Sequence, residues 1–219
     1  MHPLAKIVAL LVTLAVSGLG TMSLRPEQPL AVPFYTSVDC TPHWLTSSES
    51  KSRSLHTVAE FTLIDQTGHP FQRRGLAGKI HIADFFFTTC SGLCPALTHN
   101  LSMLAHKFAA DTSVVFVSYS VTPEIDSVAR LREYATQYRI DPKQWHLLTG
   151  DRKKIYELAR TSYFAEAAKG GSSDTGAFLH TEHFVLVDTY GRVRGIYNGT
   201  LMLENERLIE DIATIEREE

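Results

Sequence analysis

The stretch GKIHIADFFFTTCSGLCPALTHN, residues 78–100, decides the fold class because one kind of element gives way to another within it. Residues 78–87 form a continuous apolar and aromatic run, which is typical of a strand buried on both faces of a sheet. Pro95 is typical of the first turn of a helix. Apolar residues then repeat along one helical face: Leu97, Leu101, Leu104 and Phe108. The stretch therefore predicts a buried strand that leads into a helix, with Cys90 and Cys94 at the junction.

Strand and helix patterns alternate on both sides of this junction. We expect a hairpin at 56–72, strands at 113–121 and 144–150, helices at 125–138 and 151–164, a second hairpin at 182–199 and an amphipathic helix at 204–219. This order predicts an α/β fold with a central mixed sheet. A cysteine pair after the first long strand, at the start of the first helix, fits the thioredoxin arrangement. In open α/β sheets chemistry takes place at the carboxyl ends of strands, where Cys90 falls.

The N-terminal part differs from the rest in composition. Residues 1–24 contain one early lysine and then an apolar run, which indicates either a cleaved signal peptide or a retained membrane anchor. Residues 25–54 carry four prolines and a Ser-rich end, so we interpret them as a linker that partly wraps the domain at 55–219. We therefore expect the bulk of the chain to face an extracytoplasmic space, such as a periplasm or an intermembrane-type space.

The overall composition excludes several classes of protein. The 219 residues are 44% hydrophobic and 21% charged with a formal net charge of −3, so neither a nucleic-acid partner nor a polyelectrolyte is indicated. Three cysteines are too few for a scaffold built on disulfides, and an odd number leaves at least one thiol unpaired. We interpret Cys40, which stands alone, as a small apolar residue or a free thiol without a functional role.

The spacing of Cys90 and Cys94 allows more than one chemistry. Cβ atoms four residues apart in a helix lie about 5–6 Å from each other, whereas a disulfide needs about 3.5–4.5 Å. A disulfide therefore requires Cys90 to lie in a loop, which Gly92 and Pro95 favour. Two thiolates on one metal ion lie roughly 3.7–4 Å apart, so the spacing also suits a metal site. The positive end of a helix dipole favours thiolates in both cases. Two structural thiols remain the third alternative.

A metal ion held by two thiolates needs a further ligand, and the chain has ten histidines. His180 and His183 are the best candidates because they follow the Gly/Ser-rich stretch at 165–177 and open an apolar run. In a strand they would point to opposite faces, so at most one would aim at the cysteines. His180 is favoured because it lies nearer the loop, and His183 stays the alternative. Soft sulfur with imidazole suits copper or zinc, but a structural zinc site needs a fourth protein ligand.

Four segments together resemble the Sco/SenC family of copper proteins, which serve cytochrome c oxidase assembly. They are FFFTTCSGLCP (85–95), VSYSVTPEIDSVARLREYATQY (117–138), WHLLTGDRKKIYELA (145–159) and HTEHFVLVDTYGRVRGIYNG (180–199). The family motif T-x-C-P-x-x-C-P is matched except for Ser91, which replaces its first proline. In the family the ligand histidine stands eleven residues before the glycine of the last hairpin turn. Counted back from Gly191, this position is His180.

The resemblance implies a thioredoxin-like fold with an added N-terminal hairpin, exported and commonly anchored to the membrane through its N-terminus. It also implies one copper ion, Cu(I) or Cu(II), held by Cys90, Cys94 and His180. Members are thought to deliver copper to the CuA centre of the oxidase, or to reduce the cysteines of that centre so that copper can enter. Another copper acceptor and a thiol reductant are further expected partners. The roles of Cys40 and His183 stay open.

Two enzyme classes compete with a copper-binding protein. A thiol–disulfide oxidoreductase would use Cys90 and Cys94 as its redox-active pair. Thioredoxins, however, use C-x-x-C and a cis-proline before a late strand, and this chain has no proline after Pro142. A thiol peroxidase would use Cys90 as nucleophile and Cys94 as resolving thiol. We therefore expect a copper chaperone rather than an enzyme.

Overall fold

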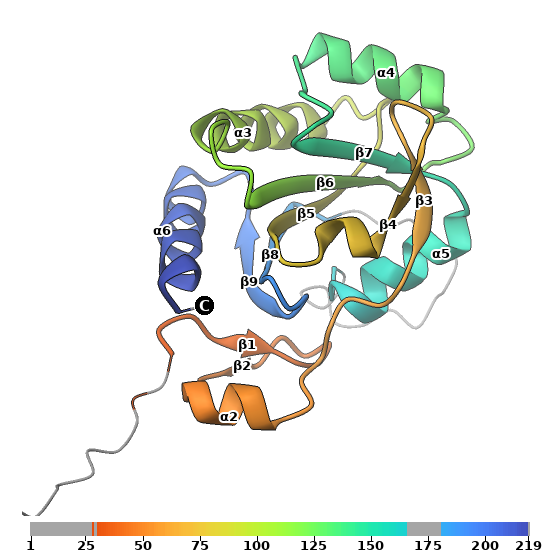
Figure 1. The fold of residues 1–219 in the computed structure, drawn as a ribbon. Helices are drawn as coiled ribbons and strands as arrows, with labels where there is room; N and C mark the ends of the chain where they lie inside the picture. Colours follow the sequence, from red (N-terminus) through yellow and green to blue (C-terminus); the bar gives the residue numbers. More distant parts are fainter. Residues whose placement is uncertain (1–27, 29, 166–180, 219) are drawn as a thin grey trace, which may run out of the picture.

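The computed structural model describes residue 28 and residues 30–165 and 181–218 (Figure 1). These residues form a nine-stranded mixed sheet in the order β2-β1-β9-β8-β5-β6-β7-β3-β4. Its strands are β1 (Phe34–Tyr35), β2 (Pro42–His43), β3 (Thr62–Asp65), β4 (Pro70–Gln72), β5 (Ile80–Phe86), β6 (Val114–Ser120), β7 (Trp145–Thr149), β8 (His183–Val187) and β9 (Val193–Asn198). The three central strands β5, β6 and β7 are parallel, and all other neighbouring pairs are antiparallel.

Helices flank both faces of this sheet. They are α2 (Ser47–Ser52), α3 (Cys94–Lys107), α4 (Val128–Gln137), α5 (Arg152–Glu157) and α6 (Met202–Glu218), with a 3-10 turn η1 (Arg73–Leu76) and a π-helical turn η2 (Leu158–Ser162). The side chains of Ser127 and Asp151 cap α4 and α5 by accepting hydrogen bonds from backbone N–H groups. Within the described residues, no helix is both long enough and apolar enough to cross a membrane.

The sheet separates two buried clusters, and β5 contributes to both because its side chains alternate. Ile80, Ile82 and Phe86 pack in the cluster covered by α3, α4 and α6. Ala83 and Phe85 pack in the cluster on the other face, which α5 and η2 cover. All seven residues of β5 are buried, as the apolar run at 78–87 predicted. The predicted mixed α/β fold is thus confirmed.

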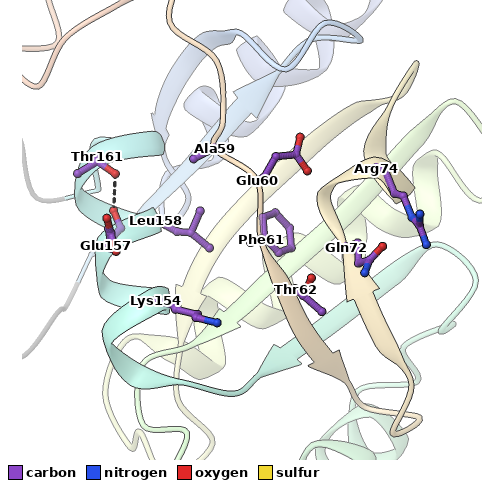
Figure 2. A pocket seen from close by; sticks show the side chains of 10 residues that line it. All are labelled: Ala59, Glu60, Phe61, Thr62, Gln72, Arg74, Lys154, Glu157, Leu158 and Thr161. Atoms are coloured by element: carbon purple, nitrogen blue, oxygen red, sulfur yellow. Dashed lines mark hydrogen bonds between the residues drawn. The ribbon is translucent and has the colours of Figure 1, made fainter.

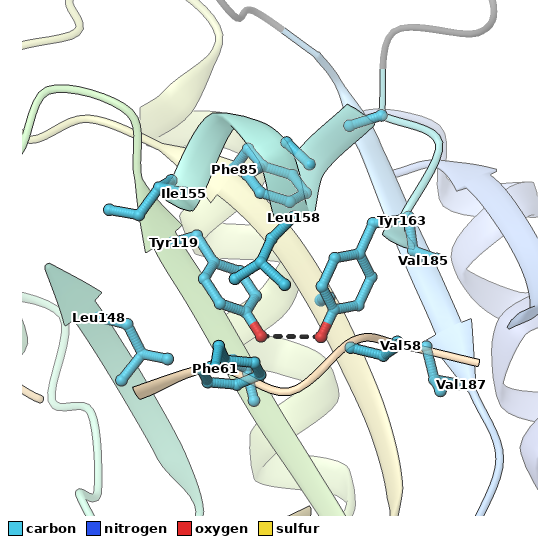
Figure 3. Close-up of a cluster of buried hydrophobic side chains, with 14 of the residues drawn as sticks. Val58, Phe61, Phe85, Tyr119, Leu148, Ile155, Leu158, Tyr163, Val185 and Val187 are labelled. Atoms are coloured by element: carbon cyan, nitrogen blue, oxygen red, sulfur yellow. Dashed lines mark hydrogen bonds between the residues drawn. The ribbon is translucent and has the colours of Figure 1, made fainter. Parts of the chain in front are cut away.

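The cluster beneath α5 combines aliphatic side chains with a group of contacting aromatic rings (Figure 3). The Tyr119 and Tyr163 hydroxyls lie 2.7 Å apart, and Phe85 stacks on Tyr119 with ring centroids 5.3 Å apart. His81 Nε2 lies 3.2 Å from the Tyr163 hydroxyl. Burial, with a smaller effect of Arg73, lowers the pKa of His81 to about 3, so the ring is neutral in this core.

The stretch expected to be a linker contributes β1, β2 and α2 in its described part, and β1 pairs with β9. Arg194 of β9 fixes the start of this segment although its own side chain is only 1% exposed. Its guanidinium donates to the carbonyls of Val32 (2.7 Å) and Pro33 (3.1 Å). It also forms ion pairs with Asp188 (3.4 Å) and Glu218 (2.7 Å). The segment is therefore bound to the body of the domain at the C-terminal end of α6.

Candidate functional site

The two cysteines lie at the junction of β5 and α3. Cys90 is in the loop that follows β5, and Cys94 is the first residue of α3, with Pro95 next to it. Leu93 occupies the N-cap position and has no side chain that can accept a hydrogen bond. The backbone N–H groups at this helix start are therefore available to the Cys90 sulfur.

The two thiols contact each other and differ in acidity. Partial burial alone would raise the pKa of the Cys90 thiol. Hydrogen bonds from the Cys94 thiol and from the backbone N–H groups of Cys94, Gly92 and Leu93 outweigh burial and lower the pKa of Cys90 below its ordinary value. Burial, together with the contact to Cys90, raises the pKa of Cys94 to about 12. Of the two thiols, Cys90 thus loses its proton first, and Cys94 donates a hydrogen bond to its sulfur.

A buried acid, Asp84, lies on the α3-facing side of β5. Its side chain is 4% exposed, and burial raises its pKa to about 7 against the effect of a hydrogen bond from Ser118. The Ser118 hydroxyl in turn accepts a hydrogen bond of 2.8 Å from the Trp145 indole N–H. When Asp84 is ionised, its charge raises the pKa of Cys94, so the acid and the cysteine pair interact electrostatically.

A second buried acid, Asp126, connects the cysteine loop to the loop after β6. Its carboxylate accepts hydrogen bonds from the Thr88 hydroxyl (2.6 Å), the Ser120 hydroxyl (2.6 Å) and the Thr122 hydroxyl (3.1 Å). The backbone N–H of Thr88 also donates to it at 3.3 Å. Arg130 Nε donates to the Thr88 hydroxyl oxygen at 3.2 Å.

The start of β8 lies at the same end of the sheet as the cysteines. β8 runs antiparallel to β5, with His81 opposite Val187 and Ala83 opposite Val185, so earlier residues of β8 lie further toward the end of β5. Thr181 is 4% exposed, and its hydroxyl lies 2.9 Å from His183 Nδ1. The predicted ligand His180 lies outside the described residues. Among the described residues, no group of three or more His, Cys, Asp or Glu side chains is arranged to hold a metal ion.

The sequence patterns did not single out Asp84 or Asp126. Asp84 carries a recognisable signal, because it is the one carboxylate inside the apolar run at 78–87. Asp126 carries none, since an acid in a loop before a helix is usually exposed. Cys40 is an unpaired, half-buried thiol in the turn between β1 and β2, and burial raises its pKa.

A cavity of about 630 Å³ lies away from the cysteines, between the chain leading into β3, the strand β4 and α5 (Figure 2). Phe61 and Leu158 form its apolar part. Charged side chains of both signs surround them: Glu60, Arg74, Lys154 and Glu157. Neither Cys90 nor Cys94 lines this cavity, so the thiol chemistry does not use it.

The chain is similar to known proteins over most of its length. Residues 49–217 match the family model SCO1/SenC. The chain is 32% identical over 159 residues to the SCO1 protein homolog of Bacillus subtilis, which covers 72% of this chain and 81% of that protein. It is 25% identical over 163 residues to a protein of Stutzerimonas stutzeri provisionally named as copper-binding, covering 73% and 78% of the two chains.

A crystal structure of a SCO1/SenC family lipoprotein from Bacillus anthracis superposes with a TM-score of 0.64 at 29% identity. It covers 74% of this chain and 95% of that one. The Bacillus subtilis Sco structure, described as having a disulfide switch and as a cytochrome c oxidase assembly protein, gives a TM-score of 0.61 at 29% identity, covering 73% and 93%. The predicted thioredoxin-like fold is thus confirmed. With a family model that matches most of its length, the chain belongs to the SCO1/SenC family.

Proposed function

We propose that this protein binds one copper ion through Cys90, Cys94 and His180 and passes it on as cargo. The observation that carries the proposal is the contact between the two thiols at the start of α3, where backbone N–H groups stabilise the thiolate of Cys90. Copper prefers thiolate ligands in its reduced state and accepts imidazole in both oxidation states.

The donor set fits a cargo ion that must be bound and released. A thiolate is already favoured at Cys90, and the Cys94 proton leaves when a metal replaces it, so copper binding releases protons. The third ligand is assigned to His180 because it directly precedes Thr181, which lies at the same end of the sheet as the cysteines. Two thiolates and one neutral imidazole give a site charge of −1 with Cu(I) and of zero with Cu(II).

The acceptor that we propose is the CuA centre of cytochrome c oxidase, to which the protein delivers copper or whose cysteines it prepares. The Bacillus subtilis Sco structure, described as that of a cytochrome c oxidase assembly protein, supports this assignment. We place the protein in an extracytoplasmic space, attached to or exported across the membrane by residues 1–24. The description of the Bacillus anthracis relative as a lipoprotein supports a membrane-associated location.

The test is a copper titration of residues 25–219 that combines calorimetry with absorption and electron paramagnetic resonance spectra. We expect about one copper per chain and spectra that show sulfur and nitrogen ligands. Cys90→Ala, Cys94→Ala and His180→Ala should each abolish tight Cu(II) binding, whereas His183→Ala, the matched control, should retain it. Retained binding in His180→Ala with loss in His183→Ala would contradict the ligand assignment.

A second candidate function is thiol–disulfide exchange by the same cysteines. The acidity of Cys90 and the buried thiol of Cys94 favour it, because exchange needs an attacking thiolate and a resolving thiol. Metal-free protein that reduces a general disulfide substrate such as insulin, with a rate unchanged in His180→Ala, would support this function. A protein that is inactive in this assay but binds copper tightly would exclude it.

A further inference from the structure

We propose that Asp126 is a positioning residue for the cysteine site, holding the loop that presents Cys90 opposite Cys94. The copper part of this inference rests on the proposed function, and the part that concerns the thiol pair does not. The proposal starts from the contacts of one carboxylate that joins two loops. Asp126 is 0% exposed, lies immediately before the N-cap residue of α4 and binds the segment just before Cys90.

The Phe87–Thr88 peptide unit is the link between Asp126 and Cys90. Its N–H, which belongs to Thr88, donates to both carboxylate oxygens of Asp126 at 3.3 Å. Its C=O, which belongs to Phe87, accepts the backbone N–H of Cys90 at 3.3 Å. Because a peptide unit is planar and stiff, fixing its N–H also fixes the direction of its C=O. Asp126 therefore sets the position of the Cys90 backbone through one rigid group.

The same region of the chain reaches Cys94. The backbone N–H of Phe87 donates to the Cys94 sulfur and opposes the rise in the pKa of that thiol. The Thr88 hydroxyl donates to Asp126 at 2.6 Å and accepts from Arg130 Nε at 3.2 Å, so the threonine is held from two directions. The segment held by Asp126 thus contacts both cysteines through backbone groups.

The loop after β6 also holds the carboxylate of Asp126. The hydroxyls of Ser120 and Thr122 donate to one carboxylate oxygen at 2.6 and 3.1 Å. A buried anion that is held by hydroxyl and amide donors is costly unless its hydrogen bonds are well formed. The N-terminal end of α4 lies next to it and contributes a favourable partial charge. An aliphatic residue would avoid this cost, so we infer that the carboxylate is retained for the geometry that it imposes.

The expected consequence concerns the thiol pair rather than the fold. Without the carboxylate, the Phe87–Thr88 peptide can turn and the Cys90 sulfur spends less time in contact with Cys94. Groups that orient metal ligands typically contribute 10- to 100-fold to metal affinity, so we expect a loss of about that size for copper. Cys90 and Cys94 should also form a disulfide less readily, because the effective concentration of one thiol at the other falls.

The experiment compares Asp126→Asn with Asp65→Asn in the whole soluble domain. Asp65 is the matched control, since its carboxylate also accepts from hydroxyl and backbone donors: Thr67 N–H (2.9 Å), the Thr67 hydroxyl (2.6 Å) and His69 N–H (3.0 Å). It is the last residue of β3, opposite Leu148 of β7, and these three hydrogen bonds of its carboxylate stay within the β3–β4 turn. Asparagine keeps the shape of each side chain but loses acceptor capacity.

Two quantities are measured for each variant. The first is the equilibrium constant for closing the Cys90–Cys94 dithiol with oxidised dithiothreitol, in which two thiols lose two protons and two electrons and the reagent is reduced to its dithiol. The second is the affinity for added Cu(II), with the position of the sulfur-to-copper absorption band. We expect Asp126→Asn to lower the equilibrium constant for disulfide formation and the affinity for Cu(II), and to shift the sulfur-to-copper absorption band. Asp65→Asn should leave all three unchanged.

Values for Asp126→Asn equal to those of Asp65→Asn would overturn the proposal. If Asp126→Asn does not fold, Thr88→Val and Thr88→Ser replace it, and only the valine variant should lower the two constants. Wild-type protein that binds no copper would contradict the proposed function, and the dithiol equilibrium would still decide the role of Asp126.

Discussion

Replacing Asp84 with asparagine should remove a pH dependence of stability that is specific to this buried acid. Its pKa is about 7 in the folded protein, against 3.8 for an ordinary aspartate, because burial disfavours the charged form. Between pH 4 and pH 7, Asp84 therefore carries a proton in the folded state but not in the unfolded state. Stability falls with rising pH across this window, by about 1.4 kcal/mol for each pH unit, which gives about 4 kcal/mol in total.

The assay is urea unfolding of reduced, metal-free protein at several pH values from 4 to 8. The difference in the free energy of unfolding between Asp84→Asn and wild type should move in favour of the variant by about 4 kcal/mol over this range. Protonation of His81 also changes stability, because its lowered pKa favours the folded state as pH rises to about 6.5. This effect is common to both proteins and cancels in the difference.

Asp65→Asn serves as the control with the opposite sign. Hydrogen bonds from Thr67 and His69 lower the pKa of Asp65 despite the effect of its burial, so the ionised form stabilises the folded protein. This variant should be less stable than wild type by a constant amount above about pH 4, and the difference should shrink as the pH falls below 4 through the lowered pKa of Asp65. Parallel curves for wild type and Asp84→Asn between pH 4 and pH 8 would refute the reasoning about Asp84.

Two further predictions concern the thiols and the core. Iodoacetamide at pH 7.5 should alkylate Cys90 well before Cys94, because the pKa of Cys90 is lowered and that of Cys94 is about 12; equal labelling of the two peptides in mass spectra would contradict this. Arg194→Met should destabilise the domain by about 1–3 kcal/mol in urea unfolding, because it removes an ion-pair partner of Asp188 and Glu218 and the donor to the carbonyls of Val32 and Pro33; a loss under 1 kcal/mol would count against this role.

Much of the fold followed from local sequence patterns. The apolar run at 78–87 and Pro95 predicted β5 and α3, and the turn at Tyr190–Gly191 predicted the hairpin of β8 and β9, in which Gly191 adopts a φ of +83°. The strands β1 and β2 could not be predicted in this way. Each has two residues, which is too short for an alternating pattern, and β1 depends on pairing with the distant β9.

Only the part of the candidate site whose residues are both chemically distinctive and close in sequence could be predicted. Cys90 and Cys94 stand out because thiols are rare in this chain and these two occur at a strand–helix junction. The contacts of Asp126 depend on two loops that are 38 residues apart in sequence and meet only in the folded sheet. Burial of Arg194 likewise depends on Glu218 at the far end of α6, which no local pattern reveals.

The two outermost strands of the sheet have a consequence for how such a protein meets other molecules. β2 and β4 are two and three residues long, and each begins with a proline, which has no N–H to offer to an incoming chain. Short borders of this kind discourage the lateral pairing through which exposed sheets aggregate. A protein with such edge strands can therefore contact other molecules without forming a continuous sheet with them.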